Sequence, residues 1–489
     1  MTTSEPMPWG GAQEMSAWEA LMWRSEGDPR TRSTGIVLEI LDSEPTWERF
    51  VEEHEQAVRL IPRLRERVVA PHLPLVQPVW SADPHFDIQH HVRRTRLAAP
   101  GTHRDLLDLC EDLIRRPLDP ARPPWEAILV TDLEGGRAAY LFKVHHSLSD
   151  GMGLMQLQAL THRRTADRTE NLFERARVGA GTITPGALLA GRVRQGVATA
   201  PRVGAKGVVS ILRYAGKVAA DPAARTQGGL EYVRSLRRML TPPDTGRSPL
   251  MSNTGVASRF LTLDIPLADL KAAAKAADSS LNDAYVSAVL GGLRRYHEAH
   301  DAVVDSIPIG MPVSMRTADQ PGGGNRFAGV RLAVPLAEPD PAVRMARIRA
   351  AVRQVRGERA LGFLEQLSPV LTRLPAPAII ELSAGLTTST DLNISNIPGN
   401  PDPLYLAGTR VLGTYPLGPR PGIGLMATMV TYAGTCCLGF NIDARSFPDL
   451  DVLERALEEG FTEVLALAAP RTMGSAARGA ATSSKVEQA

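Results

Sequence analysis

The stretch that constrains the fold most is an apolar run that ends in two adjacent histidines, His145 and His146. Apolar and β-branched residues at 138–144 predict a buried strand. After the histidines the chain turns polar for a few residues, and apolar residues then recur at helical spacing over 152–160. The pattern predicts a strand, a loop and a helix, with the histidines at a junction where side chains can reach a cleft.

The chemistry of this junction follows from the residue types. Neighbouring residues that leave a strand point to opposite sides, so one histidine is expected to face a substrate while the other packs inward. Imidazole has an unperturbed pKa of about 6.5 and can act as a general base near neutral pH. Asp150 comes four residues after His146 and is followed by Gly151. Asp150 either folds back under the loop or pairs with a cation elsewhere, and Gly151 is expected where the backbone turns tightly.

Two other interpretations of the histidine pair stay open from the residues alone. The pair could be structural histidines with satisfied hydrogen bonds, or half of a metal site. Adjacent histidines rarely bind one ion, and no carboxylate or cysteine stands at the usual ligand spacing. We therefore expect no metal site.

Composition limits the class of protein. A chain of 489 residues with 43% hydrophobic and 22% charged content predicts a globular protein of two or three domains. Three cysteines, two of them adjacent, cannot form a disulfide framework, which favours a cytoplasmic location. Residues 1–9 lack the basic start and apolar core of a secretory signal, and no apolar run approaches 18 residues. Any membrane contact is therefore expected to be peripheral.

Residues 186–240 differ from the rest of the chain. They contain ten basic residues and two acidic ones, a net charge of +8, and part of the segment has the pattern of a basic amphipathic helix. Such a helix suits contact with a membrane or lipid droplet. A solvated crossover between two domains, with its apolar face on the protein, is the open alternative. Nucleic acid is not expected as a partner, because the segment lacks an aromatic stacking platform.

Several motifs together resemble a known family. His-His-x-x-x-Asp-Gly, here at 145–151, is the signature of the CoA-dependent acyltransferase superfamily, which includes chloramphenicol acetyltransferase and peptide-synthetase condensation domains. The chain resembles one branch, the bacterial wax ester synthase/acyl-CoA:diacylglycerol acyltransferase family. Further matching stretches occur in family order on both sides of this motif, at residues 62–69, 117–126, 281–283, 312–316 and 393–399. The resemblance covers roughly residues 10 to 468.

The resemblance implies a fold and a division of the chain. The fold class is α/β, with two chloramphenicol-acetyltransferase-like halves around a central tunnel, joined by a helical crossover. We expect a first acyltransferase half at 1–170 with the motif, a basic helical crossover at 171–250, a second half at 251–470 and a disordered tail at 471–489.

The resemblance also implies a reaction and roles for residues. A fatty acyl group would move from long-chain acyl-CoA, a substrate rather than a cofactor, to diacylglycerol or a fatty alcohol, with His146 as general base and no other cofactor. By superfamily analogy Arg316 is the salt-bridge partner of Asp150. Asn282 could donate hydrogen bonds to a developing oxyanion or cap a helix, and the resemblance favours the first.

Two positions depart from the family pattern. Pro124 stands where leucine is usual, beside Trp125, which we expect to pack beneath a hairpin, and Asn400 stands where a second proline is usual. Two alternatives therefore remain: a same-fold acyltransferase with another alcohol or amine acceptor, and an inactive protein that binds lipid surfaces.

Overall fold

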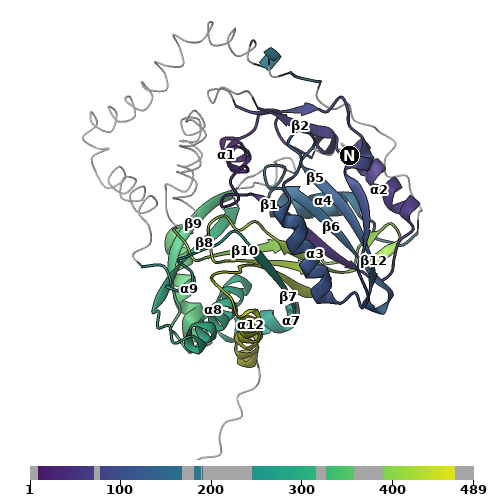
Figure 1. Cartoon of the computed structure of the whole chain (residues 1–489). Helices are drawn as coiled ribbons and strands as arrows, with labels where there is room; N and C mark the ends of the chain where they lie inside the picture. The colour runs from purple at the N-terminus through teal and green to yellow at the C-terminus, as the bar shows by residue number, and fades with distance from the viewer. Residues whose placement is uncertain are drawn as a thin grey trace, which may run out of the picture.

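Two six-stranded sheets form the framework of the protein. The computed structural model describes residues 9–70, 77–167, 181–184, 186–188, 190, 245–314, 327–356 and 389–468. The first sheet has the strand order β11-β12-β1-β6-β5-β4 and the second has the order β7-β14-β13-β10-β8-β9. Each sheet carries helices and has its own cluster of buried apolar side chains, so the predicted two-half α/β fold is confirmed (Figure 1).

The first half contains most of the N-terminal elements. Its strands are β1 (Thr34–Leu41), β4 (Val92–Arg96), β5 (Trp125–Leu133) and β6 (Arg137–His145), with a separate ribbon of β2 (Glu66–Val69) and β3 (Val79–Ala82). Its helices are α1 (Ala17–Ser25), α2 (Trp47–Leu60), α3 (His103–Arg115) and α4 (Gly151–Thr161). Strands β5 and β6 pair through a turn in which Gly135 and Gly136 have positive φ, so the predicted hairpin is confirmed.

The second half repeats the alternation of strands and helices. Its strands are β7 (Ser258–Pro266), β8 (Ser306–Ser314), β9 (Phe327–Pro335), β10 (Leu392–Pro398), β13 (Leu425–Tyr432) and β14 (Thr435–Asp443). Its helices are α7 (Leu267–Ala276), α8 (Leu281–Ala299), α9 (Pro341–Arg356) and α12 (Leu450–Leu465). Helix α8 is buried along most of its length, because its inward residues are small or apolar.

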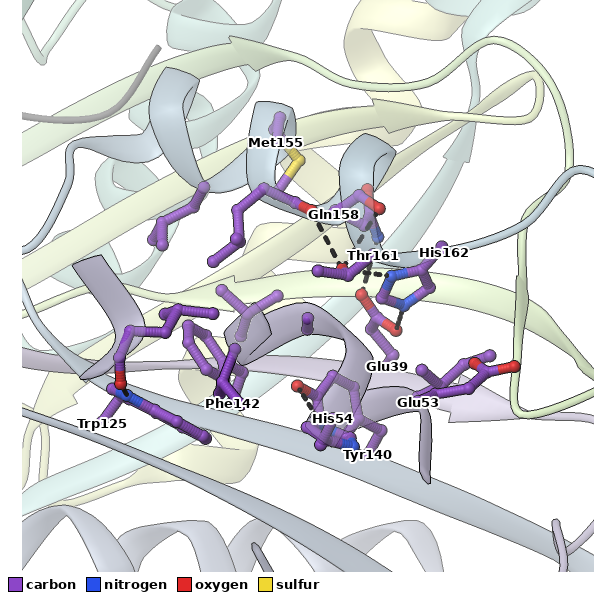
Figure 2. Close-up of a pocket in the computed structure, with 17 residues that line it drawn as sticks. Glu39, Glu53, His54, Trp125, Tyr140, Phe142, Met155, Gln158, Thr161 and His162 are labelled. Carbon is purple, nitrogen blue, oxygen red and sulfur yellow. Dashed lines mark hydrogen bonds and ion pairs between the residues drawn. The ribbon is translucent and has the colours of Figure 1, made fainter. Parts of the chain in front are cut away.

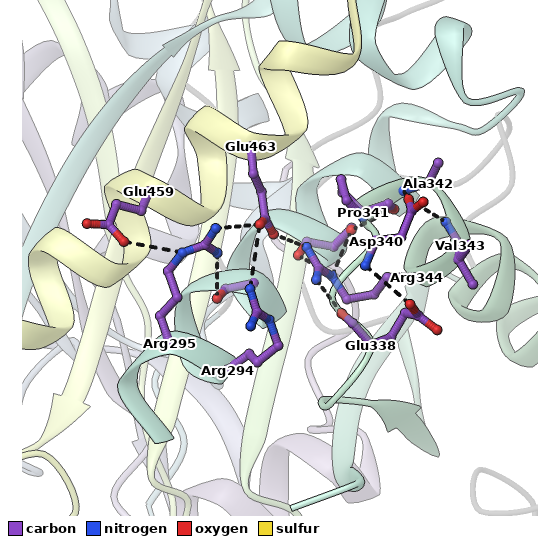
Figure 3. A network of polar contacts seen from close by, with 12 residues as sticks. Arg294, Arg295, Glu338, Asp340, Pro341, Ala342, Val343, Arg344, Glu459 and Glu463 are labelled. Carbon is purple, nitrogen blue, oxygen red and sulfur yellow. Dashed lines mark hydrogen bonds and ion pairs between the residues drawn. The ribbon is translucent and has the colours of Figure 1, made fainter. Parts of the chain in front are cut away.

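Three helices of this half meet around one carboxylate. Glu463 of α12 pairs with Arg344 of α9 and lies 2.5 Å from Nη2 of Arg295 on α8 (Figure 3). Arg344 is fully buried, and it also donates hydrogen bonds to the backbone oxygens of Ser287 and Glu338. The network satisfies a guanidinium that burial would otherwise leave without partners.

The C-terminal part of the sequence contributes a strand to the first sheet. Strands β11 (Tyr405–Leu406) and β12 (Thr409–Leu417) lie in the C-terminal part of the sequence but extend the first sheet, where β12 pairs antiparallel with β1 (Figure 1). The expected boundaries of 251–470 placed these residues in the second half, but their strands pair in the first sheet. The reason is that period-2 alternation predicts a strand but does not say which sheet it joins. The expected crossover at 171–250 and tail at 471–489 fall almost entirely outside the described residues, as does the basic segment.

Candidate active site

The histidine motif lies where β6 ends and α4 begins, as the sequence predicts. His145 is the last residue of β6 and pairs with Thr34 of β1, while the backbone N–H of His146 donates to the carbonyl of Ser33 at 2.9 Å. Helix α4 starts at Gly151. The predicted strand, loop and helix are therefore confirmed.

His145 faces the interior and is held on both ring nitrogens. Its Nδ1 accepts a hydrogen bond from the backbone N–H of Ser147 at 3.1 Å, so the ring proton belongs on Nε2. That Nε2 lies 3.1 Å from a carboxylate oxygen of Glu26, and the ring meets Trp23 edge-on. With 1% of its surface exposed, His145 is the inward histidine that strand alternation requires.

Glu26 is a site residue that the sequence did not reveal. Besides His145, its carboxylate accepts hydrogen bonds from the backbone N–H of Ser33 at 2.6 Å and the hydroxyl of Thr34 at 2.7 Å. Burial opposes ionisation, but these hydrogen bonds and the nearby imidazole together lower the pKa of Glu26 below its usual value. Glu26 thus joins the start of β1 to the motif. It stands just after α1 in the sequence, with no motif to mark it.

His146 is the next residue after the strand and is partly exposed. Its backbone is fixed by Ser33, beside the Glu26 carboxylate that holds Ser33 and Thr34. The motif therefore offers one inward, restrained imidazole and one at the loop, where a reacting group can approach it.

Asp150 and Gly151 have local structural roles. Asp150 is buried and caps α4, since its Oδ1 accepts the backbone N–H of Gly153 at 2.9 Å. This contact is consistent with folding back at the loop, and pairing with a cation elsewhere stays a prediction. A Cβ on Gly151 would lie 2.3 Å from Cδ1 of Ile397 on β10. Gly151 has no positive φ, and close contact between the two halves is a reason for glycine that the sequence did not show.

The two candidates from the second half have different outcomes. Arg316 lies outside the described residues, so its salt bridge to Asp150 stays a prediction. Asn282 is the second residue of α8, whose N-cap is Ser280 in a capping box with Asp283. The capping role considered for Asn282 is therefore wrong. Its side-chain nitrogen lies 3.9 Å from the sulfur of Met311 on β8, and the residue is half-buried.

A cavity lies within the first half, beside the motif. It is lined from β1, β5, β6, α2 and α4, with Leu406 of β11, and holds about 40 Å³ of space open to water-sized molecules (Figure 2). Trp125 is buried there and donates from its ring nitrogen to the carbonyl of Leu64 at 2.8 Å, which confirms its packing role. A tunnel between the halves stays a prediction.

One end of the cavity carries an unexpected polar cluster. Glu39 interrupts an otherwise apolar strand, and its carboxylate lies 2.8 Å from Nε2 of His162 and accepts the amide of Gln158 at 2.7 Å. His54 pairs with Phe50 and Tyr140 in the same region. The acidic residue in the strand at 34–41 was the one signal in the sequence that could have revealed this cluster.

The described residues contain neither a metal-ligand cluster nor a helix that could span a membrane. No group of three or more histidine, cysteine, aspartate or glutamate side chains within the described ranges could hold a metal ion. In the same part of the chain, no helix is long and apolar enough to cross a membrane.

Comparisons with known proteins match this chain to one family. The profile of the wax ester synthase/diacylglycerol acyltransferase catalytic domain matches residues 15–285, and that of the C-terminal domain of the same proteins matches 323–464. A protein of Mycobacterium tuberculosis that carries the name of a diacylglycerol O-acyltransferase is 37% identical over 469 residues, covering 94% of each chain. One of Mycobacterium bovis with a similar name is 31% identical over 405 residues, covering 80% of this chain and 84% of its own.

Solved structures show the same fold at lower identity. The wax ester synthase/diacylglycerol acyltransferase of Marinobacter aquaeolei has a TM-score of 0.61 at 20% identity, covering 93% of this chain and 99% of its own. The first condensation domain of the calcium-dependent antibiotic synthetase has a TM-score of 0.59 at 14% identity, with 94% and 97% covered. A starter condensation domain of rhizomide synthetase, solved with C8-CoA, has a TM-score of 0.56 at 13% identity, with 94% and 95% covered.

Proposed function

Because this chain belongs to the wax ester synthase/diacylglycerol acyltransferase family, we propose that it transfers a fatty acyl group from acyl-CoA to the hydroxyl of diacylglycerol, a long-chain alcohol, or both. The observation that carries the proposal is the arrangement of the histidine pair. His145 is locked inward by Ser147 and Glu26, and His146 stands at the loop with part of its surface exposed. A general base needs this access to the group that it deprotonates.

The reaction requires one base and no cofactor. His146 takes the proton of the acceptor hydroxyl, and the oxygen forms a bond to the thioester carbonyl carbon. When the tetrahedral intermediate collapses, the carbon–sulfur bond breaks and the protonated His146 returns the proton to the CoA sulfur. Asn282 would donate a hydrogen bond to the oxyanion, and Arg316 would hold Asp150 from the other half.

Direct transfer without an acyl-enzyme is favoured by the state of the thiols. All three cysteines, Cys110, Cys436 and Cys437, are buried. Burial raises the pKa of Cys436 to about 11 and that of Cys437 to about 12, and it raises that of Cys110 further. None of these thiols supplies a thiolate at neutral pH, so a covalent cysteine intermediate has no candidate.

The location of the reaction follows from the acceptor. Diacylglycerol and long-chain alcohols gather at membranes and lipid droplets, so we place the protein in the cytoplasm in peripheral contact with such a surface. The +8 net charge of residues 186–240 supports this proposal, because cations attract anionic headgroups.

The test is transfer from labelled palmitoyl-CoA to diolein or hexadecanol by the wild type and by His146→Ala. We expect labelled triacylglycerol or wax ester from the wild type and a loss of about 10²- to 10⁴-fold in kcat for the variant, with the fold retained. His90→Ala, a change of the same type at an exposed position, is the matched control.

Near-normal turnover by His146→Ala would show that His146 is not the general base. Absence of product with both acceptors would direct the search to other alcohols or amines. Binding to lipid vesicles without release of CoA would favour the inactive lipid-binding protein.

A further inference from the structure

The cavity in the first half runs along α4, away from the histidine motif. Helix α4 begins directly after the motif at Gly151, and its residues Leu154 and Thr161 both line the cavity. The seven steps from Leu154 to Thr161 advance about 10 Å along the helix axis. The Leu154 end is therefore the end nearer to His146, and the Thr161 end is the far one.

The two ends differ in chemistry. Near Leu154 the wall is apolar and includes Met155, Trp125 and Phe142. Figure 2 shows Trp125 and Phe142 on the side opposite Glu53 and His162. The near end thus suits an alkyl chain, and unbranched Met155 can adjust to its width.

The far end is lined with hydrogen-bond acceptors. The side-chain nitrogen of Gln158 donates to Glu39 at 2.7 Å and to the hydroxyl of Thr414 at 3.1 Å, which uses both of its hydrogens. Because a carboxylate only accepts, the nitrogen must face Glu39, and the amide orientation is fixed. The side-chain carbonyl oxygen of Gln158, a residue only 6% exposed, has no donor among the described residues, whereas the backbone carbonyl accepts from His162.

Tyr140 adds a second acceptor. Nδ1 of His54 lies 2.8 Å from the carbonyl of Phe50 and donates to it, so Nε2 of the ring is unprotonated. The hydroxyl of Tyr140 therefore donates its single hydrogen to that Nε2 at 3.2 Å. Its oxygen keeps lone pairs that can accept a hydrogen bond from a molecule in the cavity.

We propose that this cavity binds the distal part of the acyl chain and favours a chain that carries a hydroxyl near its far end. The inference rests on the proposed acyl transfer and adds a substrate class to it. The hydroxyl would donate to the carbonyl oxygen of Gln158, with the carboxylates of Glu39 and Glu53 and the oxygen of Tyr140 close by. A plain alkyl end would leave the side-chain carbonyl oxygen of Gln158 without a donor in a buried place, which costs free energy.

The open space agrees with a small polar group at the far end. A volume of about 40 Å³ holds about three waters. A terminal hydroxyl can replace such a water and keep its hydrogen bond, whereas a methyl group cannot. Eight carbon–carbon bonds of an extended alkyl chain span about 10 Å, since each bond advances about 1.25 Å.

The test compares ω-hydroxyacyl-CoAs of increasing length with unsubstituted acyl-CoAs of the same length. For the wild type we expect kcat/KM to favour the hydroxylated chain by about three- to tenfold at one length. In Gln158→Leu this ratio should fall to about one. The ratio is taken within each variant, so a general loss of activity cancels. Gln156→Leu makes the same change two residues away, at a residue that does not line the cavity, and should keep the wild-type ratio.

A second variant tests the cavity independently of Gln158. Ala57 lies at the far end, where the cavity adjoins a smaller pocket, and Ala57→Leu should shift the preferred chain to a shorter length. Thermal unfolding of each variant shows whether it is folded. A wild-type ratio of one at every length, or a ratio and a length profile unchanged in the two variants, would overturn the proposal.

Failure of the proposed reaction is a separate result. If the wild type transfers no acyl group to any acceptor, the same comparison is made with dissociation constants, measured by calorimetry or by tryptophan fluorescence, to which Trp125 in the cavity wall contributes. A binding ratio of about three- to tenfold that disappears in Gln158→Leu would support the cavity assignment even then, and equal binding of both chains would refute it.

Discussion

His54 and His162 line the same cavity, but their pKa values shift in opposite directions. Burial lowers the pKa of His54 to about 4, and the nearby His162 adds to this, although the hydrogen bond from Nδ1 of His54 to the carbonyl of Phe50 acts in the opposite direction. For His162 burial also lowers the pKa, but the charge and hydrogen bond of Glu39 outweigh it and the net shift is upward. The carboxylate of Glu39 thus makes the imidazole of His162 easier to protonate than that of His54.

This difference predicts a pH dependence of stability that His54 causes. Its pKa is about 4 when folded and about 6.5 when unfolded, so its contribution is present above pH 6.5 and is lost as the pH falls toward 4. Between pH 7.5 and pH 5 we expect wild type to lose about 2 kcal/mol more than His54→Leu in the free energy of unfolding. Urea unfolding at the two pH values measures this loss, and equal losses in both proteins would contradict the assignment.

The helices of the second half depend on a carboxylate shared among arginines. Burial raises the pKa of Glu463, but its hydrogen bonds and ion pairs with Arg295 and Arg344 outweigh this and lower it, so the residue stays ionised. Glu463 connects α12 with α8 and α9, as Figure 3 shows. The charge spacing along α12 does not reveal that three helices meet at this position.

Removal of this charge should weaken the packing of the three helices. Glu463→Gln leaves the fully buried guanidinium of Arg344 without its counter-charge, and we expect a loss of about 3 kcal/mol in the free energy of unfolding. Glu459→Gln, one turn earlier, removes an exposed ion pair with Arg295 and should cost less than about 1 kcal/mol. Urea unfolding of both variants tests this, and equal costs would mean that burial of the pair is unimportant.

At the scale of the whole molecule, the contribution of β12 to the first sheet makes the halves interdependent. β12 completes the first sheet, and the buried cluster of the first half includes Phe260, Val430 and Cys437 from the second. A Cβ on Gly439 of β14 would lie 2.2 Å from the carbonyl oxygen of Pro416 on β12. The two sheets therefore approach closely through backbone, which leaves no flexible side chain to absorb a change.

Because β12 of the C-terminal part completes the first sheet, we expect both halves to unfold in one transition. All six tryptophans lie between residues 9 and 125, so tryptophan fluorescence reports only on the first half. We expect this signal and far-UV circular dichroism to change at the same urea concentration. Gly439→Ala, although it lies in the second half, should shift the tryptophan transition to lower urea. Two separate transitions, or a tryptophan transition unaffected by Gly439→Ala, would show independent halves.

The sequence by itself determined the local structure of the site and the family. Strand alternation and helical spacing around His145 and His146 predicted the strand, the loop, the helix and the division into an inward and an outward histidine, because these depend on residues close together in the chain. The motifs in their order identified the family. These inferences need no knowledge of distant contacts.

Tertiary structure alone decided which distant residues meet. It brought Glu26 to His145, placed Ile397 against Gly151, joined β12 to the first sheet and gathered Glu39, Gln158 and His162 at the end of a cavity. Such contacts depend on how sheets pair and helices pack, and many sequences with the same local pattern could pair differently. The reason for glycine at 151 and the polar end of the cavity therefore became visible only when the chain was folded.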